Sequence, residues 1–179
     1  MGLLRQTIKA GLRAAAAFAR RQEGSHAVEF ALVAPIFIVL IFATAQAAII
    51  YLAEAYLETA TEEAARLVLT NQAGSMTAAQ FQTALCNNIT TLFTCSNIMV
   101  NLAPATSETS IVTAAPAFNS NGTLANSLTY TQPDPGQIAV LQVLYQWPVI
   151  GLPLGWNFAN LGNGTYLMMS TQVFIVEAQ

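Results

Sequence analysis

Glu29 raises the clearest chemical question in this sequence, because it directly precedes a long run of uncharged, mostly apolar residues. A carboxylate at the edge of an apolar environment is costly unless it is paired, so we expect Glu29 to have a partner. Cleavage of the chain after Gly24 would leave a cationic α-amino group on Ser25, about one helical turn from Glu29. In a helical assembly, Glu29 of one subunit could pair with that amine of another subunit. The pair would neutralise both charges and fix the axial register.

Three simpler interpretations of this segment remain open. Glu29 also fits an ordinary interfacial acid, because a helix N-terminus favours negative charge. Gly24 also fits a linker residue at which no processing occurs. The third interpretation is signal-peptide cleavage within "ATAQA", where Ala43, Ala45 and Ala47 are small residues of the kind found at such sites.

The two cysteines, Cys86 and Cys95, have eight residues between them, and both follow the apolar run. An exported pair at this spacing is expected to form a disulfide, which in the chain-entropy model contributes about 2 to 3 kcal/mol. A metal site is not expected, because the sole histidine, His26, precedes the apolar run.

No catalytic constellation is visible in the sequence, so we do not expect an enzyme. A histidine-based nucleophile system needs its base beside the nucleophile, and His26 lies next to the apolar run. The chain has neither a P-loop nor a dinucleotide-binding glycine pattern, and no cofactor is predicted. Glu108 and Asp134 lie in polar loops with no visible partner. An exported hydrolase that uses two carboxylates is the remaining enzymatic alternative.

The uncharged run from Phe30 to Ala53 is long enough to cross a membrane. Its 24 residues, at about 1.5 Å each, exceed a hydrocarbon core of roughly 30 Å. Five of the six basic residues precede the run, so the positive-inside rule places the N-terminus in the cytoplasm and everything after the run across the membrane. Beyond residue 24 the chain has one arginine against eight acidic residues, which excludes a nucleic-acid surface.

Periodicity predicts an α+β fold in which a long helix packs on a small antiparallel sheet. Apolar or small residues at 53, 57, 60, 64 and 67 continue the helix from His26 to about Thr70. Glu54, Glu58, Glu62 and Arg66 form a stripe at four-residue steps, interpreted as a solvated face or a partner-facing one. A second short helix follows, with Thr77 and Gln80 as a capping box and Ala78, Phe81 and Leu85 on one face. Strands are predicted around residues 97–104, 136–150 and 165–178.

The predicted organisation has four parts. Residues 1–24 form a basic cytoplasmic leader that is cleaved, and residues 25–53 form the transmembrane helix. Residues 54–70 extend that helix, and residues 71–179 form an α/β domain that contains the Cys86–Cys95 disulfide.

The segment "RRQEGSHAVEF" resembles type IV prepilins in its basic leader, its glycine and its glutamate at the fifth position after the glycine. The run "HAVEFALVAPIFIVLIF" is more specifically similar to TadE-like proteins, minor pseudopilins of the tight-adherence (Tad, or Flp) pilus system. The order of "FQTALCNNITTLFTCSNIMVNL", "VLYQWPVI" and "STQVFIVEAQ" is also similar to that family. Gln46 departs from the pattern, because many relatives carry a glutamate there, and the chain lacks a proline after Glu177. The resemblance therefore leaves TadE and its sibling TadF open.

This resemblance implies a pilin-like fold and processing by a prepilin peptidase between Gly24 and Ser25, with Glu29 and Phe30 acting in assembly. The implied partners are the inner membrane, the peptidase, the major Flp pilin, a sibling pseudopilin and the Tad membrane platform. The expected function is to initiate or cap a Tad-type pilus from a bacterial inner membrane, with the C-terminal domain in the periplasm or in the pilus. The alternative is a permanently anchored, uncleaved periplasmic binding module.

Overall fold

The structure is a computed structural model that describes residues 23–87 and 89–178. The predicted leader, apart from its last two residues, lies outside the described residues. The chain divides into two compact units, with the boundary between Thr44 and Ala45. We call them the N-terminal unit and the sheet unit.

The long helix α2 covers Glu23–Leu69, which confirms the predicted helix and starts it three residues earlier. Pro35 lies inside the helix and interrupts its hydrogen-bond ladder locally. The helix ends at Leu69, and in the turn that follows it Asn71 has a left-handed φ of 57°, a conformation that asparagine tolerates. The Ala73 N–H donates to the Leu67 carbonyl across this end (2.9 Å), so an otherwise unpaired carbonyl is satisfied.

The short helix α3 covers Ala78–Cys86 and has the predicted capping box. The Gln80 N–H donates to Thr77 Oγ1 (3.3 Å), and the Thr77 N–H donates to Gln80 Oε1 (2.8 Å). Phe81 and Leu85 are buried, as predicted for the apolar face. Ala78 is exposed and does not belong to that face, because it lies in the first turn of the helix, away from the core.

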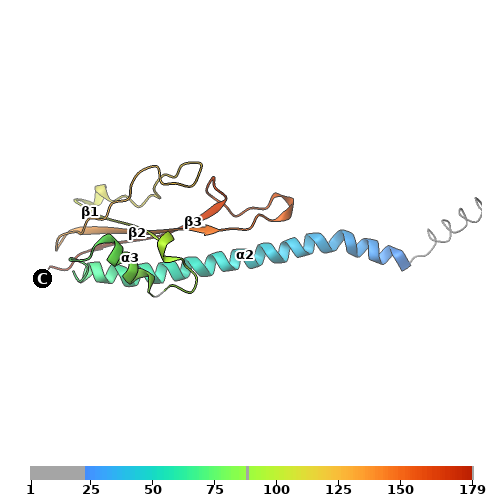
Figure 1. The fold of residues 1–179 in the computed structure, drawn as a ribbon, viewed down its shortest axis with the longest axis horizontal. Helices are drawn as coiled ribbons and strands as arrows, with labels where there is room; N and C mark the ends of the chain where they lie inside the picture. The colour runs from blue at the N-terminus through green and yellow to red at the C-terminus, as the bar shows by residue number, and fades with distance from the viewer. Residues whose placement is uncertain (1–22, 88, 179) are drawn as a thin grey trace, which may run out of the picture. The chain divides into compact units, whose positions relative to one another are not determined.

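Three strands form one antiparallel sheet in the order β1-β2-β3, which confirms the predicted α+β class (Figure 1). The strands are β1 (Met99–Ala105), β2 (Ile138–Pro148) and β3 (Thr165–Ile175), joined in register by pairs such as Leu102↔Leu141 and Leu144↔Met169. Short 3₁₀ turns occur at η1 (Cys95–Asn97), η2 (Glu108–Ser110) and η3 (Pro153–Gly155). The central strand β2 is buried from Ala139 to Tyr145, because both faces of the sheet are covered.

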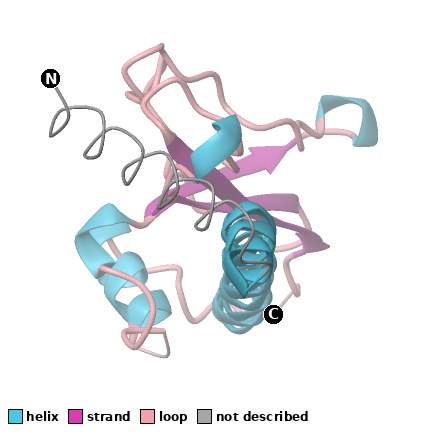
Figure 2. Cartoon of the chain, turned by 90° about the vertical axis from the view of Figure 1, so that its right-hand side faces the viewer, coloured by secondary structure: helices cyan, strands magenta, loops and turns pink. Residues whose placement is uncertain are grey.

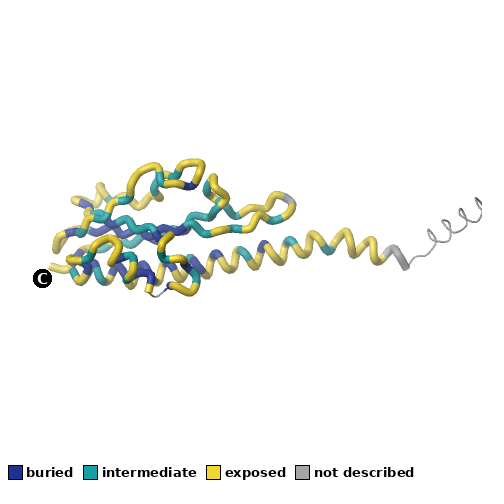
Figure 3. The backbone as a smooth tube through the Cα atoms, in the orientation of Figure 1, coloured by how far each residue is buried: buried dark blue, intermediate teal, exposed yellow. Residues whose placement is uncertain are grey.

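Within the sheet unit, helices cover one face of the sheet and a long loop covers the other (Figure 2). On the helix side, α2 buries a stripe of small residues, and Figure 3 shows burial concentrated where helix and strands meet. The stripe includes the predicted Ala53, Leu57, Ala60 and Ala64. The fifth predicted member, Leu67, is half-buried, and Val68 takes the buried place in the last turn, because a period of 3.6 drifts from a strict 4-3-4-3 pattern.

The loop between β1 and β2 is attached to the other face through the buried side chain of Gln142. Asn101 Nδ2 donates to Gln142 Oε1 (2.9 Å), and Gln142 Nε2 donates to the Ala114 carbonyl (3.2 Å). Both ends of this buried amide are therefore paired, as a buried polar group requires.

Cys86 and Cys95 form the predicted disulfide, with Cα atoms 5.7 Å apart. It joins the end of α3 to η1, just before β1 begins. Gln82 strengthens the same junction by donating to the carbonyls of Cys95 (2.8 Å) and Ile98 (2.7 Å).

Two Asn-Gly-Thr triplets form matching turns that pack against each other. In each, the asparagine Oδ1 accepts from the threonine hydroxyl (2.7 Å), at Asn121–Thr123 and at Asn163–Thr165. Gln146 joins the two turns, because it donates to the Gly122 carbonyl (2.6 Å) and accepts from Asn163 Nδ2 (2.9 Å).

The two glycines of these turns provide a matched pair for testing the packing. Gly122 and Gly164 share a φ of 79°, where an L-residue costs about 1 to 2 kcal/mol. A Cβ on Gly122 would overlap the Asn163 side chain, whereas a Cβ on Gly164 would meet nothing within 4 Å. We expect Gly122→Ala to lower the free energy of unfolding by on the order of 1 to 3 kcal/mol more than Gly164→Ala. Urea unfolding of the detergent-solubilised chain, followed by tryptophan fluorescence, measures both. Equal losses would contradict the close packing of the turns.

Candidate functional site

The predicted processing position lies in the first turn of α2. Gly24 and Ser25 are helical in backbone, because α2 begins at Glu23. The bond between them is therefore near the end of the helix, where backbone groups lack intrahelical partners and unwinding is least costly. Cleavage between Gly24 and Ser25 remains a prediction.

Glu29 is one turn further along the same helix and is exposed to the surroundings. Its side chain is 75% exposed, and Oε2 lies 3.9 Å from Nδ1 of His26, which forms an ion pair only when the imidazole is protonated. Within the described residues the structure gives Glu29 no other ion-pair partner. Phe30 beside it is 73% exposed. A single chain therefore leaves the predicted assembly residues, Glu29 and Phe30, available to another molecule.

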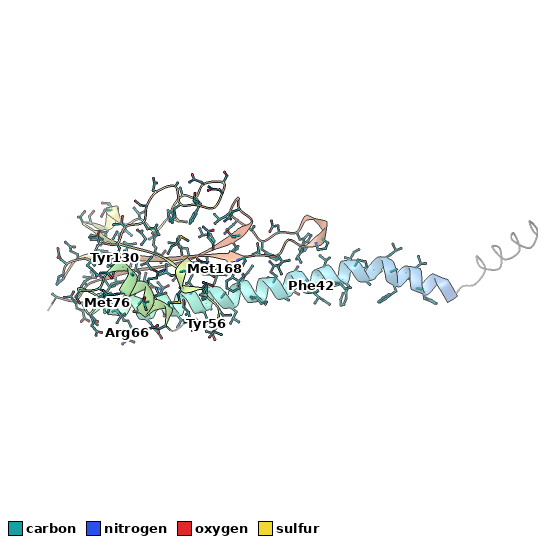
Figure 4. The ribbon with its side chains drawn as sticks, in the orientation of Figure 1. Phe42, Tyr56, Arg66, Met76, Tyr130 and Met168 are labelled. Atoms are coloured by element: carbon teal, nitrogen blue, oxygen red, sulfur yellow. A yellow bond between two sulfur atoms is a disulfide. The ribbon has the colours of Figure 1, made fainter. Side chains whose placement is uncertain are left out.

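Between Val28 and Phe42, α2 exposes large apolar side chains around the helix. This stretch is exposed because one helix alone has nothing to pack against, and Phe42 is one example (Figure 4). In the described part of the chain, α2 is the one helix that is long and apolar enough to cross a membrane. The exposed large side chains are those of Val28, Phe30, Leu32, Val33, Ile36, Phe37, Ile38, Leu40, Ile41 and Phe42.

Glu54, at the first step of the predicted acidic stripe, is hydrogen-bonded within the sheet unit. The Tyr166 hydroxyl on β3 donates to Glu54 Oε1 (3.0 Å). Burial, and then the hydrogen bond and the negative charge of Glu54, raise the pKa of Tyr166 above its ordinary value of 10.0. Glu58, Glu62 and Arg66 are exposed as predicted for a solvated face, so the prediction was wrong for Glu54 alone.

An aromatic cluster fills the end of the sheet near the disulfide. Phe93 packs edge-to-face on Tyr145 (4.8 Å between ring centroids) and on Trp147 (5.8 Å). Met168 points from β3 toward α2 and is fully buried (Figure 4). The ring contacts hold Phe93, Tyr145 and Trp147 together at this end of the sheet.

The carboxylates weighed for hydrolysis lie apart from any described network. Glu108 opens η2 and Asp134 precedes β2, and both side chains are exposed. Among the described residues neither carboxylate has a hydrogen bond or an ion pair. In the same residues no group of three or more His, Cys, Asp or Glu side chains could hold a metal ion.

Comparison with known proteins finds a family match that lies within α2. Residues 24–66 match the family described as TadE-like protein. The matched segment begins at Gly24, includes Glu29, and runs along α2 to Arg66. No curated protein and no solved structure shows a significant match to the chain.

The Tyr166–Glu54 hydrogen bond can be tested by its dependence on pH. Because the pKa of Tyr166 is raised in the folded chain, its contribution is present below pH 10 and is lost as pH rises through the raised pKa. We expect Tyr166→Phe to lower the free energy of unfolding by about 1 kcal/mol at pH 7, and by less above pH 10. Urea unfolding at both pH values measures this. The matched control is Tyr56→Phe, since Tyr56 projects from α2 away from the sheet (Figure 4). Equal effects of the two variants would contradict the assignment.

Proposed function

We propose that this chain is a minor pseudopilin that helps to initiate or cap a pilus. Its match over residues 24–66 supports a TadE-like protein of the Tad pilus system. In this proposal a prepilin peptidase cleaves after Gly24 and releases the basic leader. The chain acts as a structural subunit and not as an enzyme. Its partners would be the major Flp pilin, a sibling pseudopilin and the membrane platform.

The observation that carries the proposal is the exposed, apolar surface of α2 next to Glu29. A helix that is apolar all round is stable only in lipid or between other helices. A pseudopilin would occupy both environments, because its helix is first inserted in the membrane and then packs among the helices of neighbouring subunits. The exposed side chains from Val28 to Phe42 suit either surrounding.

Glu29 would favour packing among the helices of neighbouring subunits. In lipid its carboxylate stays at the interface, where the helix N-terminus and water stabilise it. Among subunits it would pair with the α-amino group of a cleaved Ser25, and this pairing is available only when neighbouring helices adopt one axial offset. The exposure of Glu29 in the single chain supports this role, since among the described residues its one ion-pair partner is the nearby His26.

The orientation follows the charge distribution of the sequence. Five basic residues precede α2, so the leader would stay in the cytoplasm of a bacterial cell. The sheet unit would then lie in the periplasm or at the filament tip. The disulfide fits that placement, because disulfides persist in oxidising compartments.

The N-terminus of the membrane-purified protein tests the processing step. We expect a chain that starts at Ser25 in cells with the peptidase and at Met1 or Gly2 in cells without it, measured by intact mass and N-terminal peptide sequencing. A start at Met1 or Gly2 in both strains would instead favour the uncleaved, anchored binding module. A start at Gln46 or Ala48 would indicate a secreted domain. It would contradict both the pseudopilin hypothesis and the anchored-module hypothesis.

Glu29→Ala tests the assembly step. We expect the variant to insert and be processed normally but to reduce pilus formation by on the order of tenfold, because the register-fixing ion pair is lost. Counting pili by electron microscopy, with immunoblots for insertion and cleavage, measures this. Glu58→Ala is the matched control, since Glu58 is an exposed acid on the same helix beyond the uncharged run. Normal pili in the Glu29 variant would refute the register role.

A further inference from the structure

The connection between β2 and β3, residues 149–164, contains no charged residue. We call it the β2–β3 loop. Two of its large apolar side chains are open to the surroundings, Ile150 at 76% exposed and Trp156 at 51%. A charge-free loop with exposed Ile and Trp side chains is unusual for a surface that faces only water.

Gln46 holds this loop against α2. With its amide oriented to satisfy both groups, Gln46 donates to the Ile150 carbonyl (3.1 Å) and accepts from the Ile150 N–H (2.9 Å). Both residues belong to the sheet unit. Gln46 lies inside the uncharged run that ends at Ala53, seven residues before its end. The β2–β3 loop is therefore fixed beside a stretch of α2 that is apolar enough to be in contact with a membrane.

The loop is built to present Trp156. The Leu152 N–H donates to the Trp156 carbonyl (3.0 Å) around the 3₁₀ turn η3, and Gly155 supplies the left-handed φ of 78° that this turn requires. On the return path, the Asn157 side chain accepts from the Ala159 N–H (2.9 Å). Figure 1 shows the loop extending past the ends of the strands, alongside α2.

The neighbouring surface of α2 has the same character. Ile49, Tyr51 and Leu52 are exposed at 51%, 76% and 51%. Tryptophan and tyrosine are enriched at membrane–water interfaces, where an apolar ring and a polar tip are both satisfied. Pairing with Gln46 also removes the Ile150 backbone groups from the apolar surroundings, in which they would be costly if unpaired.

We propose that the β2–β3 loop rests in the interfacial region of the membrane that α2 crosses, with Ile150 and Trp156 in contact with lipid. The occupant of this surface is a lipid bilayer and not a protein, because the loop is continuous with the uncharged face of α2 and carries no charge of its own. The sheet unit thus has two attachments to the membrane, the helix and the loop. This inference rests on α2 crossing the membrane and does not depend on cleavage by a peptidase.

The two tryptophans of the chain allow a direct test. Trp156 is exposed in the loop, whereas Trp147 is half-buried in the aromatic cluster with Phe93 and Tyr145. The full chain is reconstituted in vesicles of phosphatidylethanolamine and phosphatidylglycerol, with or without phosphatidylcholine brominated at shallow or deep acyl positions. Bromine quenches tryptophan fluorescence on close approach. Wild type, Trp147→Phe and Trp156→Phe are compared.

The Trp147→Phe chain retains only Trp156, and the Trp156→Phe chain retains only Trp147. We expect bromine to quench the fluorescence of Trp156 at least about twofold more than that of Trp147. The shallow bromine should quench Trp156 most strongly, as for a side chain in the interface. The difference between wild type and Trp156→Phe reports Trp156 without altering the aromatic cluster. It therefore decides the question even if Trp147→Phe does not fold. Retention of the Cys86–Cys95 disulfide, measured by mass under non-reducing conditions, serves as the folding check.

Three results would overturn the proposal. If Trp156 is not quenched and its emission stays at long wavelength, the loop faces water. If Trp156 and Trp147 are quenched equally, the whole sheet unit contacts lipid without a specific loop. If the emission of Trp156 is shifted to shorter wavelength without quenching, a protein covers the loop. Each result can be obtained whether or not a peptidase cleaves the chain in cells, so this test and the processing test fail independently.

Discussion

The close packing of α2 on the sheet is the interaction on which the sheet unit depends. A sheet of three strands is marginal by itself, and its buried central strand needs a cover on both faces. Small residues such as Ala53, Ala60 and Ala64 let the helix backbone approach the strands closely. Two hydrogen bonds fix the ends of this contact, from Tyr166 to Glu54 and from the Glu177 N–H to the Leu69 carbonyl (2.9 Å).

The same helix is also apolar enough to cross a membrane, and its sequence changes character along its length. Toward the N-terminus α2 exposes large apolar side chains, whereas beyond Ala53 its charged side chains are exposed, except that of Glu54, which is bonded to Tyr166. Between Ala45 and Ala53, one side of α2 packs on the sheet and another side is exposed. Ile50 and Ala53 are buried in the core, whereas Ile49 and Tyr51 are exposed. Gln46 shows how a polar side chain is tolerated there, because both ends of its amide are paired with one backbone residue.

The sequence predicted those features that depend on local pattern. The long helix, the Thr77–Gln80 capping box and the Cys86–Cys95 disulfide follow from periodicity, cap chemistry and cysteine spacing, and the structure has all three. The contacts of Glu54 and Gln46 could not be predicted, because their partners, Tyr166 and Ile150, lie more than a hundred residues away along the chain. The Asn-Gly-Thr turns were visible as loops, but their packing through Gln146 depends on the register of β2 and β3.

The exposed edge of β3 shows how the proposed membrane anchoring would limit the ways in which copies can pair. The Asn160 side chain accepts from the Leu167 N–H (2.6 Å) and donates to its carbonyl (3.3 Å), so one position of the edge is already capped. At the next outward positions, Met169, Thr171 and Val173, the described residues provide no backbone partner on that side. Strand β3 runs in the same direction as α2, since Tyr166 lies beside Glu54 and Glu177 beside Leu69. If α2 is anchored in a membrane as proposed, two copies in that membrane have α2 helices that point the same way, so their β3 edges cannot meet antiparallel. The parallel arrangement that remains is the slightly less stable one, so the proposed anchoring would protect an edge that carries no lysine or proline.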